Sequence, residues 1–394
     1  MHTNSFHTPA RVASIDVFRA ITMLLMIFVN DFWSLMNVPH WLQHARSNED
    51  FLGFSDVVFP AFLFAVGLSI PFAIEKRIEK GDTLLKTAIH ILLRTLALLV
   101  MGVFTVNYEA GISAATGLRR PMFAILMVTG FFLVWNMYPK STHWKKYLFI
   151  TLQIIGVALL VYLAVIFRDK NDGIMQKRWW GILGLIGWTY LPCALVYLVA
   201  RKRLYLHILA LLTFILLNMA GCNRWLGFFN GYIVSNGAHQ VLTMAGIIVS
   251  LLFIRYRAVF QIKKLFAVVI GLGVCFLLAG FIARNFWIIS KISATPTWIF
   301  FCTGISILTY IFLYWLVDIK EKDCYFGIIK TAGTATLTCY LVPYIAYSLF
   351  TIFSISFPDA IRAYPIGLIK SMAFALIVIG ITALLGKIRI KLKI

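Results

Sequence analysis

Residues 56–75 read DVVFPAFLFAVGLSIPFAIE, a run that carries charge only at its two ends. About 20 consecutive apolar residues are what an α-helix needs to cross the hydrocarbon core of a bilayer. Eleven further apolar runs flank this one, so the sequence predicts an all-α, polytopic membrane protein with about twelve transmembrane helices (10–12). The runs cover residues of about 15–36, 56–75, 84–106, 121–138, 147–167, 179–200, 204–220, 239–255, 264–288, 297–318, 327–352 and 365–386.

The composition of the whole chain supports this prediction. Of the 394 residues, 61% are hydrophobic and 13% are charged, whereas soluble proteins average about 45–50% and about 25%. The mean hydropathy is +0.88. An ordinary soluble enzyme is therefore excluded. No stretch is long or polar enough for a second, soluble domain, so residues 1–394 are predicted to form a single transmembrane domain. The first run carries Asp16 and Arg19 and lacks a small-residue cleavage site, which predicts a retained helix.

The basic residues predict the orientation of the chain in the membrane. The 36 Lys and Arg outnumber 15 Asp and Glu, which gives a net charge of +21. They lie in short clusters between apolar runs, as in the cytoplasmic loops of membrane proteins, so we expect the lipid bilayer rather than nucleic acid as the partner. With a cytoplasmic N-terminus, 22 of them fall on the inner side and 10 on the outer side. Both termini are therefore predicted to be cytoplasmic.

The six cysteines show no CxxC pair and no metal-ligand spacing. Most of them lie inside apolar runs. This pattern argues against a disulfide framework and against a zinc site, and no metal is predicted.

If the N-terminus is cytoplasmic and the runs cross the membrane in turn, every second loop lies on the outer face. Three polar segments are then on that face, namely 37–55, 221–238 and 289–296. The side chains of His44, Asp56, Asn236, His239 and Lys291 are therefore expected to converge there. A carboxylate beside an imidazole can orient the ring and raise its basicity, which makes His44 a candidate base. Asp56 opens the next helix, so a helix-capping role is its alternative.

Other ionisable or polar residues lie within or beside the runs, where they are costly and often functional. Asp16 and Arg19 are three residues apart and form either a self-paired couple or, through Arg19, a donor to an anionic ligand. Asn30 and Asp31 end the first run, where solvation of the helix end is the alternative to a site. His90 and Arg94 lie four residues apart on one face of run 84–106, and either line a channel or find partners nearby.

Several blocks resemble the heparan-α-glucosaminide N-acetyltransferase family. SIDVFRA at 14–20, leading to MIFVN at 26–30, is similar to the opening of that family. HA at 44–45, followed by FSDVVFPAF at 54–62, resembles the block that carries the family's catalytic histidine. SKISATPTW at 290–298 and Asp318 after Tyr314 and Trp315 are looser matches. His239 stands where the family has a carboxylate, and Ala335 where it has an asparagine. The chain looks closest to the bacterial NagX-like group, which is associated with amino-sugar use.

The resemblance implies transfer of an acetyl group from cytoplasmic acetyl-CoA to an amine, with glucosamine or a related amino sugar as acceptor. His44 and Asp56 are then the catalytic residues, with His44 acting as a base or as a nucleophile. Asn30 or Lys291 could polarise the thioester carbonyl. The substrate-binding candidates are Asn30, Asp31, His239 and Lys291. The candidates for holding acetyl-CoA at the cationic inner mouth are Arg19, Arg11, Arg94 and Lys76.

Two other functions fit many spans and buried polar residues. One is an amino-sugar permease, which would place its polar groups at mid-membrane on paired broken helices. The other is an O-acyltransferase that modifies an envelope polysaccharide. The expected location is the bacterial inner membrane. A homodimer is one possible assembly, and the sequence leaves the oligomeric state open.

Overall fold

A computed structural model describes residues 12–139, 144–223, 225, 236–258 and 261–394. Within these ranges the regular structure is helical, with two isolated β-bridges, so the predicted all-α polytopic fold is confirmed. Ten described helices are long and apolar enough to cross a membrane. An eleventh span arises if the pair Asp323–Thr334 and Thr336–Ile352, bent by 79°, is one broken span. The apolar helix α4 (Arg120–Trp135) is shorter than these. Each of the twelve predicted runs thus corresponds to a helix or a bent helix pair, while the number of spans stays a prediction.

The chain divides into two compact units, each built from segments far apart in the sequence. The first unit comprises residues 1–22, 40–92 and 188–330, and the second comprises 23–39, 93–187 and 331–394. Helices that contribute residues to both are α1 (Ala13–Asn30), α3 (Leu84–Ala110), α6 (Gly181–Ala200) and the short α11 (Lys330–Thr334).

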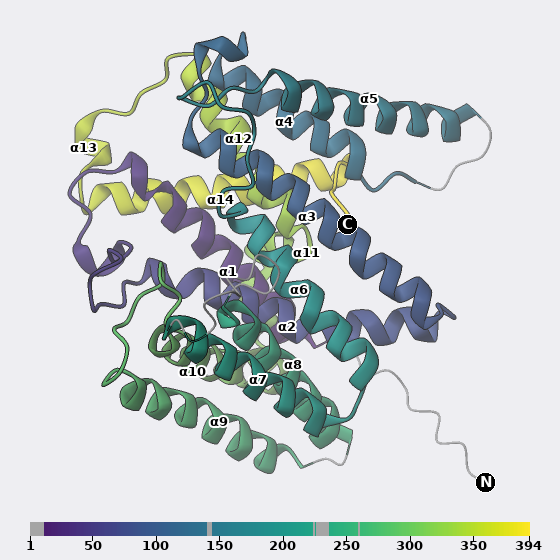
Figure 1. Cartoon of the computed structure of the whole chain (residues 1–394), viewed down its shortest axis with the longest axis vertical. Helices are drawn as coiled ribbons and strands as arrows, with labels where there is room; N and C mark the ends of the chain where they lie inside the picture. Colours follow the sequence, from purple (N-terminus) through teal and green to yellow (C-terminus); the bar gives the residue numbers. More distant parts are fainter. Residues whose placement is uncertain (1–11, 140–143, 224, 226–235, 259–260) are drawn as a thin grey trace. The chain divides into compact units, whose positions relative to one another are not determined.

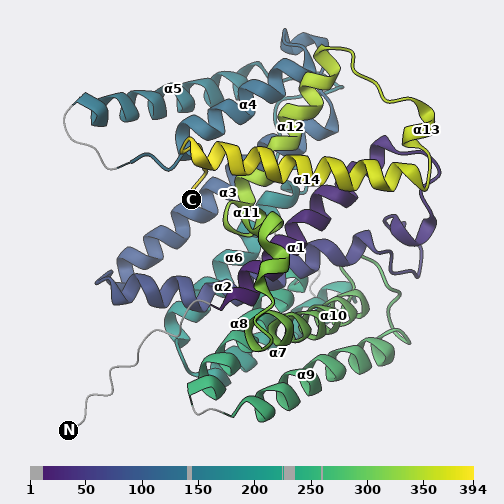
Figure 2. The same cartoon turned by 180° about the vertical axis from the view of Figure 1, so that it is seen from behind.

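The first unit contains five helices that lie together in both ribbon views (Figures 1 and 2). Helices α2 and α8 run in the same direction: the hydroxyl of Thr243 donates to the backbone carbonyl of Leu63, and the hydroxyl of Ser250 donates to that of Leu68. Their backbones approach so closely that a Cβ on Gly67 would lie 2.0 Å from the carbonyl oxygen of Thr243. The five are α2 (Ser55–Glu79), α7 (Leu204–Cys222), α8 (Ala238–Ala258), α9 (Ile262–Ala283) and α10 (Pro296–Tyr314).

Helix α10 is followed by irregular helical segments in the same unit. A π-helix η4 (Trp315–Ile319) leads to a 3-10 helix η5 (Asp323–Ile329). Within the π-helix, Asp318 accepts hydrogen bonds from the backbone N–H groups of Ala13 and Ser14, at 3.1 and 3.0 Å. These groups open helix α1 and have no intrahelical acceptor. Asp318, one of the looser matches in the family resemblance, therefore caps the first helix in this structure.

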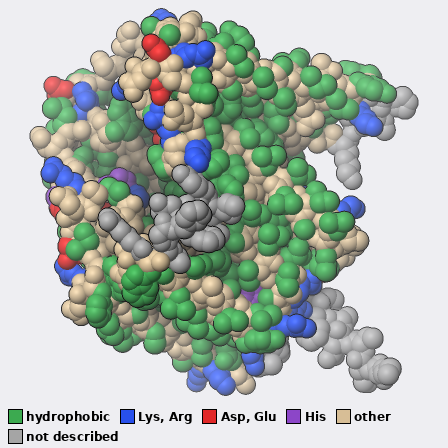
Figure 3. Space-filling view, viewed as in Figure 1, with side chains coloured by type: hydrophobic (Ala, Val, Ile, Leu, Met, Phe, Trp, Pro, Cys, Tyr) green, Lys and Arg blue, Asp and Glu red, His purple; other side chains and the backbone are tan. Residues whose placement is uncertain are grey.

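The second unit contains α4, α5 (Trp144–Ile166), α12 (Thr336–Ile352), the short α13 (Asp359–Arg362) and α14 (Ile366–Lys387). Helix α4 packs against both α5 and α12. Many apolar side chains of α5, among them Ile154, Val161 and Val165, are exposed, which is expected of a helix that faces lipid. Figure 3 shows one face of the molecule on which hydrophobic side chains predominate.

A buried charge cluster ties helix ends together within the second unit. The carboxylate of Asp31, fully buried, lies 2.7 Å from the ammonium of Lys370 in α14. Tyr347 in α12 and Ser371 in α14 donate to the same carboxylate, each at 2.6 Å. Buried charges are tolerated when they are paired and hydrogen-bonded in this way. Solvation by water at the helix end, one of the two explanations expected for Asp31, is therefore wrong.

Candidate functional site

The loop before α2 is built so that His44 meets the start of that helix. Asp56, in the first turn of α2, accepts a hydrogen bond from the backbone N–H of Ala45 at 2.9 Å. Ser55 donates to the carbonyl of Leu42 at 2.5 Å. At Gly53, a Cβ would lie 1.9 Å from the carbonyl oxygen of Gln43, so the loop closes only around glycine. These contacts fold residues 42–56 into a compact turn.

His44, Asp56 and Lys291 form one cluster at this turn. The Nδ1 atom of His44 lies 2.7 Å from Oδ1 of Asp56 and 3.2 Å from Nζ of Lys291. The Lys291 ammonium lies 3.8 Å from the same carboxylate oxygen. Asp56 is 1% exposed, Lys291 26% and His44 50%. A buried carboxylate thus holds one edge of an imidazole whose remainder is accessible.

The carboxylate of Asp56 fixes which imidazole nitrogen is free. A carboxylate can only accept hydrogen bonds, so the pairing with Asp56 requires the tautomer of His44 that carries its proton on Nδ1. In a neutral ring of this tautomer, the Nε2 atom carries the lone pair that is available to a substrate. The Asp56 side chain also accepts from Ala45 and Gly53 backbone groups. The contact with the N–H of Gly53, three residues earlier at the start of α2, is of the capping-box kind, so the expected helix-capping role and the contact with His44 are both present.

Pro60 explains why the backbone of Asp56 is also held by α10. Proline lacks the N–H that would bond to the carbonyl four residues earlier, which is that of Asp56. This carbonyl accepts instead from Nε1 of the buried Trp298, at 3.1 Å, with the thiol of Cys302 at 3.8 Å. This hydrogen bond connects the first turn of α10 to the first turn of α2, which carries Asp56.

His239 lies in the same region, in the first turn of α8. Its ring is buried and meets the rings of Phe59 and Trp298 edge-on, with centroids 5.7 and 6.1 Å away. Asn236 donates to the carbonyl of Ala294 at 3.3 Å, in the segment that follows Lys291. The five residues expected to converge therefore come from loops and helix ends that meet in the first unit. Three helices, α2, α8 and α10, direct their N-terminal ends, which favour negative charge, towards this region.

Lys291 lies in an irregular segment between α9 and α10, and its ammonium is partly removed from water. Burial lowers the pKa of Lys291, while the carboxylate of Asp56 acts in the opposite direction. The cluster thus contains one carboxylate, one amine of reduced basicity and one imidazole. Such a set can take a proton from an incoming amine and stabilise a developing negative charge.

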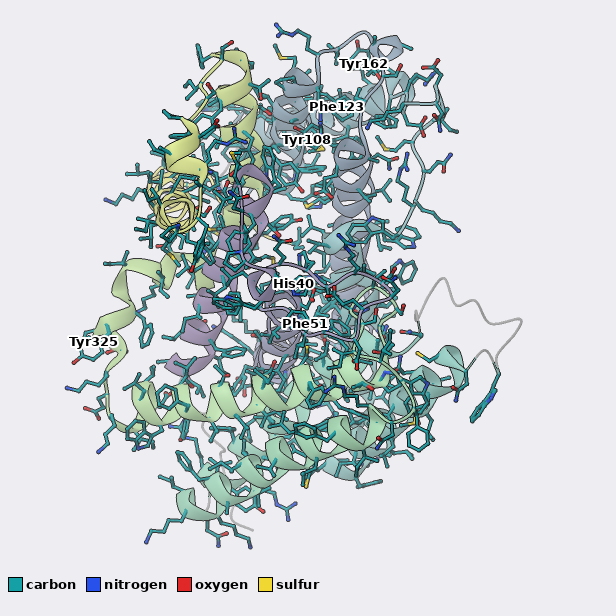
Figure 4. All side chains as sticks on the ribbon, turned by 90° about the vertical axis from the view of Figure 1, so that its left-hand side faces the viewer. His40, Phe51, Tyr108, Phe123, Tyr162 and Tyr325 are labelled. Carbon is teal, nitrogen blue, oxygen red and sulfur yellow. The ribbon has the colours of Figure 1, made fainter. Side chains whose placement is uncertain are left out.

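The second histidine of the loop has other partners. Nε2 of His40 lies 2.7 Å from a carboxylate oxygen of Glu49, and its ring packs on Phe51 with centroids 4.6 Å apart. Figure 4 shows His40 and Phe51 beside each other. His40 therefore forms a surface contact within the loop.

The four basic residues predicted to bind acetyl-CoA have different surroundings. Arg19 pairs with Asp16, so the self-paired couple is present, and Arg19 also donates to Ser69 at 3.5 Å. A small pocket beside the couple is lined by Asp16, Asp323 and Lys330, among others. Lys76 is exposed near the end of α2, and Arg94 is half-buried in α3. Arg11 lies outside the described residues. The CoA-binding roles of all four stay predictions.

Two substrate-binding candidates belong to the second unit. Asn30 is exposed at the end of α1. Asp31 is fully buried and each of its carboxylate oxygens accepts hydrogen bonds from side chains of its own unit. A substrate-binding role for Asp31 stays a prediction, and its contacts here are structural. Sequence reasoning missed Lys370 as its partner, because the two residues are 339 positions apart.

Fold and site together define a class: a polytopic helical membrane protein with a His–carboxylate–amine cluster where loops meet at helix ends. The family model described as a domain of unknown function (DUF5009) matches residues 11–234. This is more than half of the chain, and the chain belongs to that family.

Two curated relatives match shorter segments. Heparan-alpha-glucosaminide N-acetyltransferase of Homo sapiens is 32% identical over 103 residues, which cover 25% of this chain and 14% of the relative. The protein of the same name from Mus musculus is 30% identical over 183 residues, or 39% of this chain and 26% of the relative. The chain thus matches about a quarter or less of either relative. The resemblance stated from the sequence is confirmed, whereas the NagX-like subgroup stays a prediction.

Proposed function

We propose that this protein is a membrane acetyltransferase that transfers acetyl from acetyl-CoA to the amine of an amino sugar such as glucosamine. The observation that carries the proposal is the cluster of His44, Asp56 and Lys291. The similarity to N-acetyltransferases that act on heparan α-glucosaminide supports both the reaction and the class of acceptor. The proposal includes a cytoplasmic donor, an acceptor at the outer face and the bacterial inner membrane as location.

The chemistry assigns one task to each side chain. The sugar ammonium first loses a proton to solvent, and its neutral nitrogen attacks the thioester carbonyl carbon. As the C–N bond forms, the second amine proton passes to Nε2 of His44, while the C–S bond breaks and CoA thiolate leaves. Asp56 keeps the ring oriented and stabilises the imidazolium. Lys291 offers a positive charge to the carbonyl oxygen as it becomes an oxyanion. The proton on His44 then neutralises the thiolate or leaves to solvent.

A second route forms an acetyl-imidazole on His44 before the amine attacks. Direct attack is the preferred route, and it requires that both substrates reach one shared cavity. Incubation of the protein with labelled acetyl-CoA alone distinguishes the two routes. Acid-labile label on the protein indicates the acetyl-imidazole, and its absence indicates direct attack.

The central experiment measures transfer from radiolabelled acetyl-CoA to glucosamine by the full-length protein in proteoliposomes. A base that works near neutral pH contributes about 10²–10⁴-fold to a rate, so His44→Ala is expected to lower transfer at least about a hundredfold. His40→Ala is the matched control and is expected to stay close to wild type, because His40 pairs with Glu49 at the loop surface.

Near-normal transfer by His44→Ala would overturn the assignment of the base. Uptake of labelled glucosamine without any acetyl-CoA would instead support the permease. That alternative calls for paired broken helices, and the described residues contain one bent pair. Acetylation at a hydroxyl rather than at an amine would favour the O-acyltransferase.

A further inference from the structure

Two loops far apart in the sequence meet at Asp50. Its Oδ1 accepts a hydrogen bond from the backbone N–H of Ile289 at 2.8 Å. Its Oδ2 accepts from Nε of Arg284 at 3.0 Å. A second contact joins the same loops, because Ser290 donates to the carbonyl of Ser47 at 3.3 Å. Asp50 lies six residues after His44, and Ile289 lies two residues before Lys291.

The segment that carries Lys291 has no helical backbone to hold it in place. It is connected to the start of α10 by Thr295, which donates to the carbonyl of Ile288 at 2.7 Å, and by Thr297, which donates to Trp287 at 2.6 Å. These bonds fix the segment to its own helix. The position of Lys291 relative to His44 depends on contacts that cross to the other loop. Asp50 makes a charged contact of this kind away from the cluster, in addition to the contact between Lys291 and Asp56.

We infer that Asp50 is a positioning residue of the reaction centre, which holds the Lys291 segment against the loop of His44. The inference rests on the proposed function for its catalytic consequence, but the contact itself is independent of it. The backbone N–H of Ile289 is the largest cause that lowers the pKa of Asp50, and Arg284 adds to it. The carboxylate is therefore ionised at neutral pH and able to accept both hydrogen bonds.

Three variants distinguish the hydrogen bond from Ile289 to Asp50 from the ion pair between Arg284 and Asp50. Asp50→Ala removes the acceptor for Ile289 and the charge for Arg284. Asp50→Asn keeps an acceptor oxygen for Ile289, and Arg284→Gln keeps the Asp50–Ile289 hydrogen bond. A misplacement of about 1 Å in a reacting group can cost about a hundredfold in rate. We expect Asp50→Ala to lower kcat by about 10- to 100-fold with the KM for acetyl-CoA unchanged, and the other two variants to lose less.

The neighbouring Glu49→Gln is the matched control. It removes an equal charge one position away, from a residue that pairs with His40, and it is expected to keep wild-type kcat. The second readout is amide hydrogen exchange of the full-length protein, which does not depend on any substrate. Asp50→Ala is expected to speed exchange in peptides covering 286–292, while Glu49→Gln leaves them protected.

The outcomes separate this inference from the proposed function. Unchanged exchange at 286–292 in Asp50→Ala overturns the inference whatever the activity. Faster exchange together with wild-type kcat in Asp50→Ala also overturns it, provided that His44→Ala abolishes transfer. If the wild type transfers no acetyl group, the proposed function fails, and the exchange experiment still decides whether Asp50 holds the Lys291 segment.

Discussion

At the scale of single residues, the reactivity of the cluster depends on where protons sit around His44. Asp56 binds Nδ1, which leaves Nε2 as the base. The ammonium of Lys291 lies 3.2 Å from the same Nδ1 atom, so the proposed base and the proposed oxyanion partner are neighbours.

The proposed role of Lys291 predicts a particular dependence of the rate on pH. Burial lowers the pKa of Lys291 from the ordinary value of 10.5, and Asp56 opposes this. An ammonium that must be protonated to stabilise the oxyanion is lost as the pH rises through its pKa. We therefore expect kcat to fall on the alkaline side below pH 10.5 in the wild type.

Lys291→Arg tests this prediction, because a guanidinium stays protonated throughout this range. The alkaline fall is expected to move to higher pH or to disappear, with kcat at neutral pH lowered by the changed shape. The measurement is kcat for labelled acetyl transfer at a series of pH values. His40→Ala serves as control and should show the wild-type profile. An alkaline fall unchanged in the Arg variant would remove Lys291 from the role of oxyanion partner.

The sequence allowed part of this site to be predicted. His44 and Asp56 are assigned through the resemblance of their block to the acetyltransferase family, and the predicted sidedness of the loops puts Lys291 on the same side. Asp50 and Arg284 were not paired in advance, since 234 residues separate them and neither has a local pattern. The role of Pro60 in freeing the Asp56 carbonyl was also missed, although a proline four residues after a site residue is a usable signal.

At the scale of helices, Asp31 and Lys370 offer a test of how the second unit is held together. Removing one partner of a buried ion pair leaves an uncompensated charge and costs about 3–5 kcal/mol. Lys370→Met is therefore expected to destabilise the detergent-solubilised protein by about that amount in thermal or denaturant unfolding. The double variant Asp31→Asn/Lys370→Met removes both charges and is expected to be more stable than Lys370→Met alone.

The ion pair between the exposed Lys86 and the half-buried Asp82, at the surface, is the control for this measurement. Exposed ion pairs contribute about 0–1 kcal/mol, so Lys86→Met should change stability little. Equal effects of Lys86→Met and Lys370→Met would contradict the view that burial makes the Asp31–Lys370 pair important.

Hydropathy located the helices better than it located their ends. The predicted run 264–288 ends in the structure at Ala283, because Arg284 leaves the helix and pairs with Asp50. The run 327–352 proves to be a pair of helical segments bent by 79°. A bend does not alter hydropathy, so a window of apolar residues cannot reveal it. Tertiary hydrogen bonds, which the sequence does not display, decide such boundaries.

At the scale of the whole molecule, the function requires that the site and the basic loops lie on opposite sides of the membrane. Helix α2 links the two, since His44 precedes its start and Lys76 lies near its end. Its 25 residues extend about 37 Å, which exceeds the hydrocarbon thickness of about 30 Å. If α2 spans the bilayer, the loop before it and the turn after it face different compartments.

Single cysteines on either side of α2 test this sidedness. In a variant whose six native cysteines are replaced, Asn48→Cys and Lys80→Cys each introduce one thiol at an exposed position. The excess of basic residues predicts that the turn at Lys80 is cytoplasmic. A membrane-impermeant maleimide added to intact cells should therefore label Asn48→Cys, and should label Lys80→Cys only after the membrane is permeabilised. Labelling of both in intact cells would show that α2 does not span. Labelling of Lys80→Cys alone would place His44 on the cytoplasmic side, and acetyl transfer to an acceptor at the outer face would then be wrong.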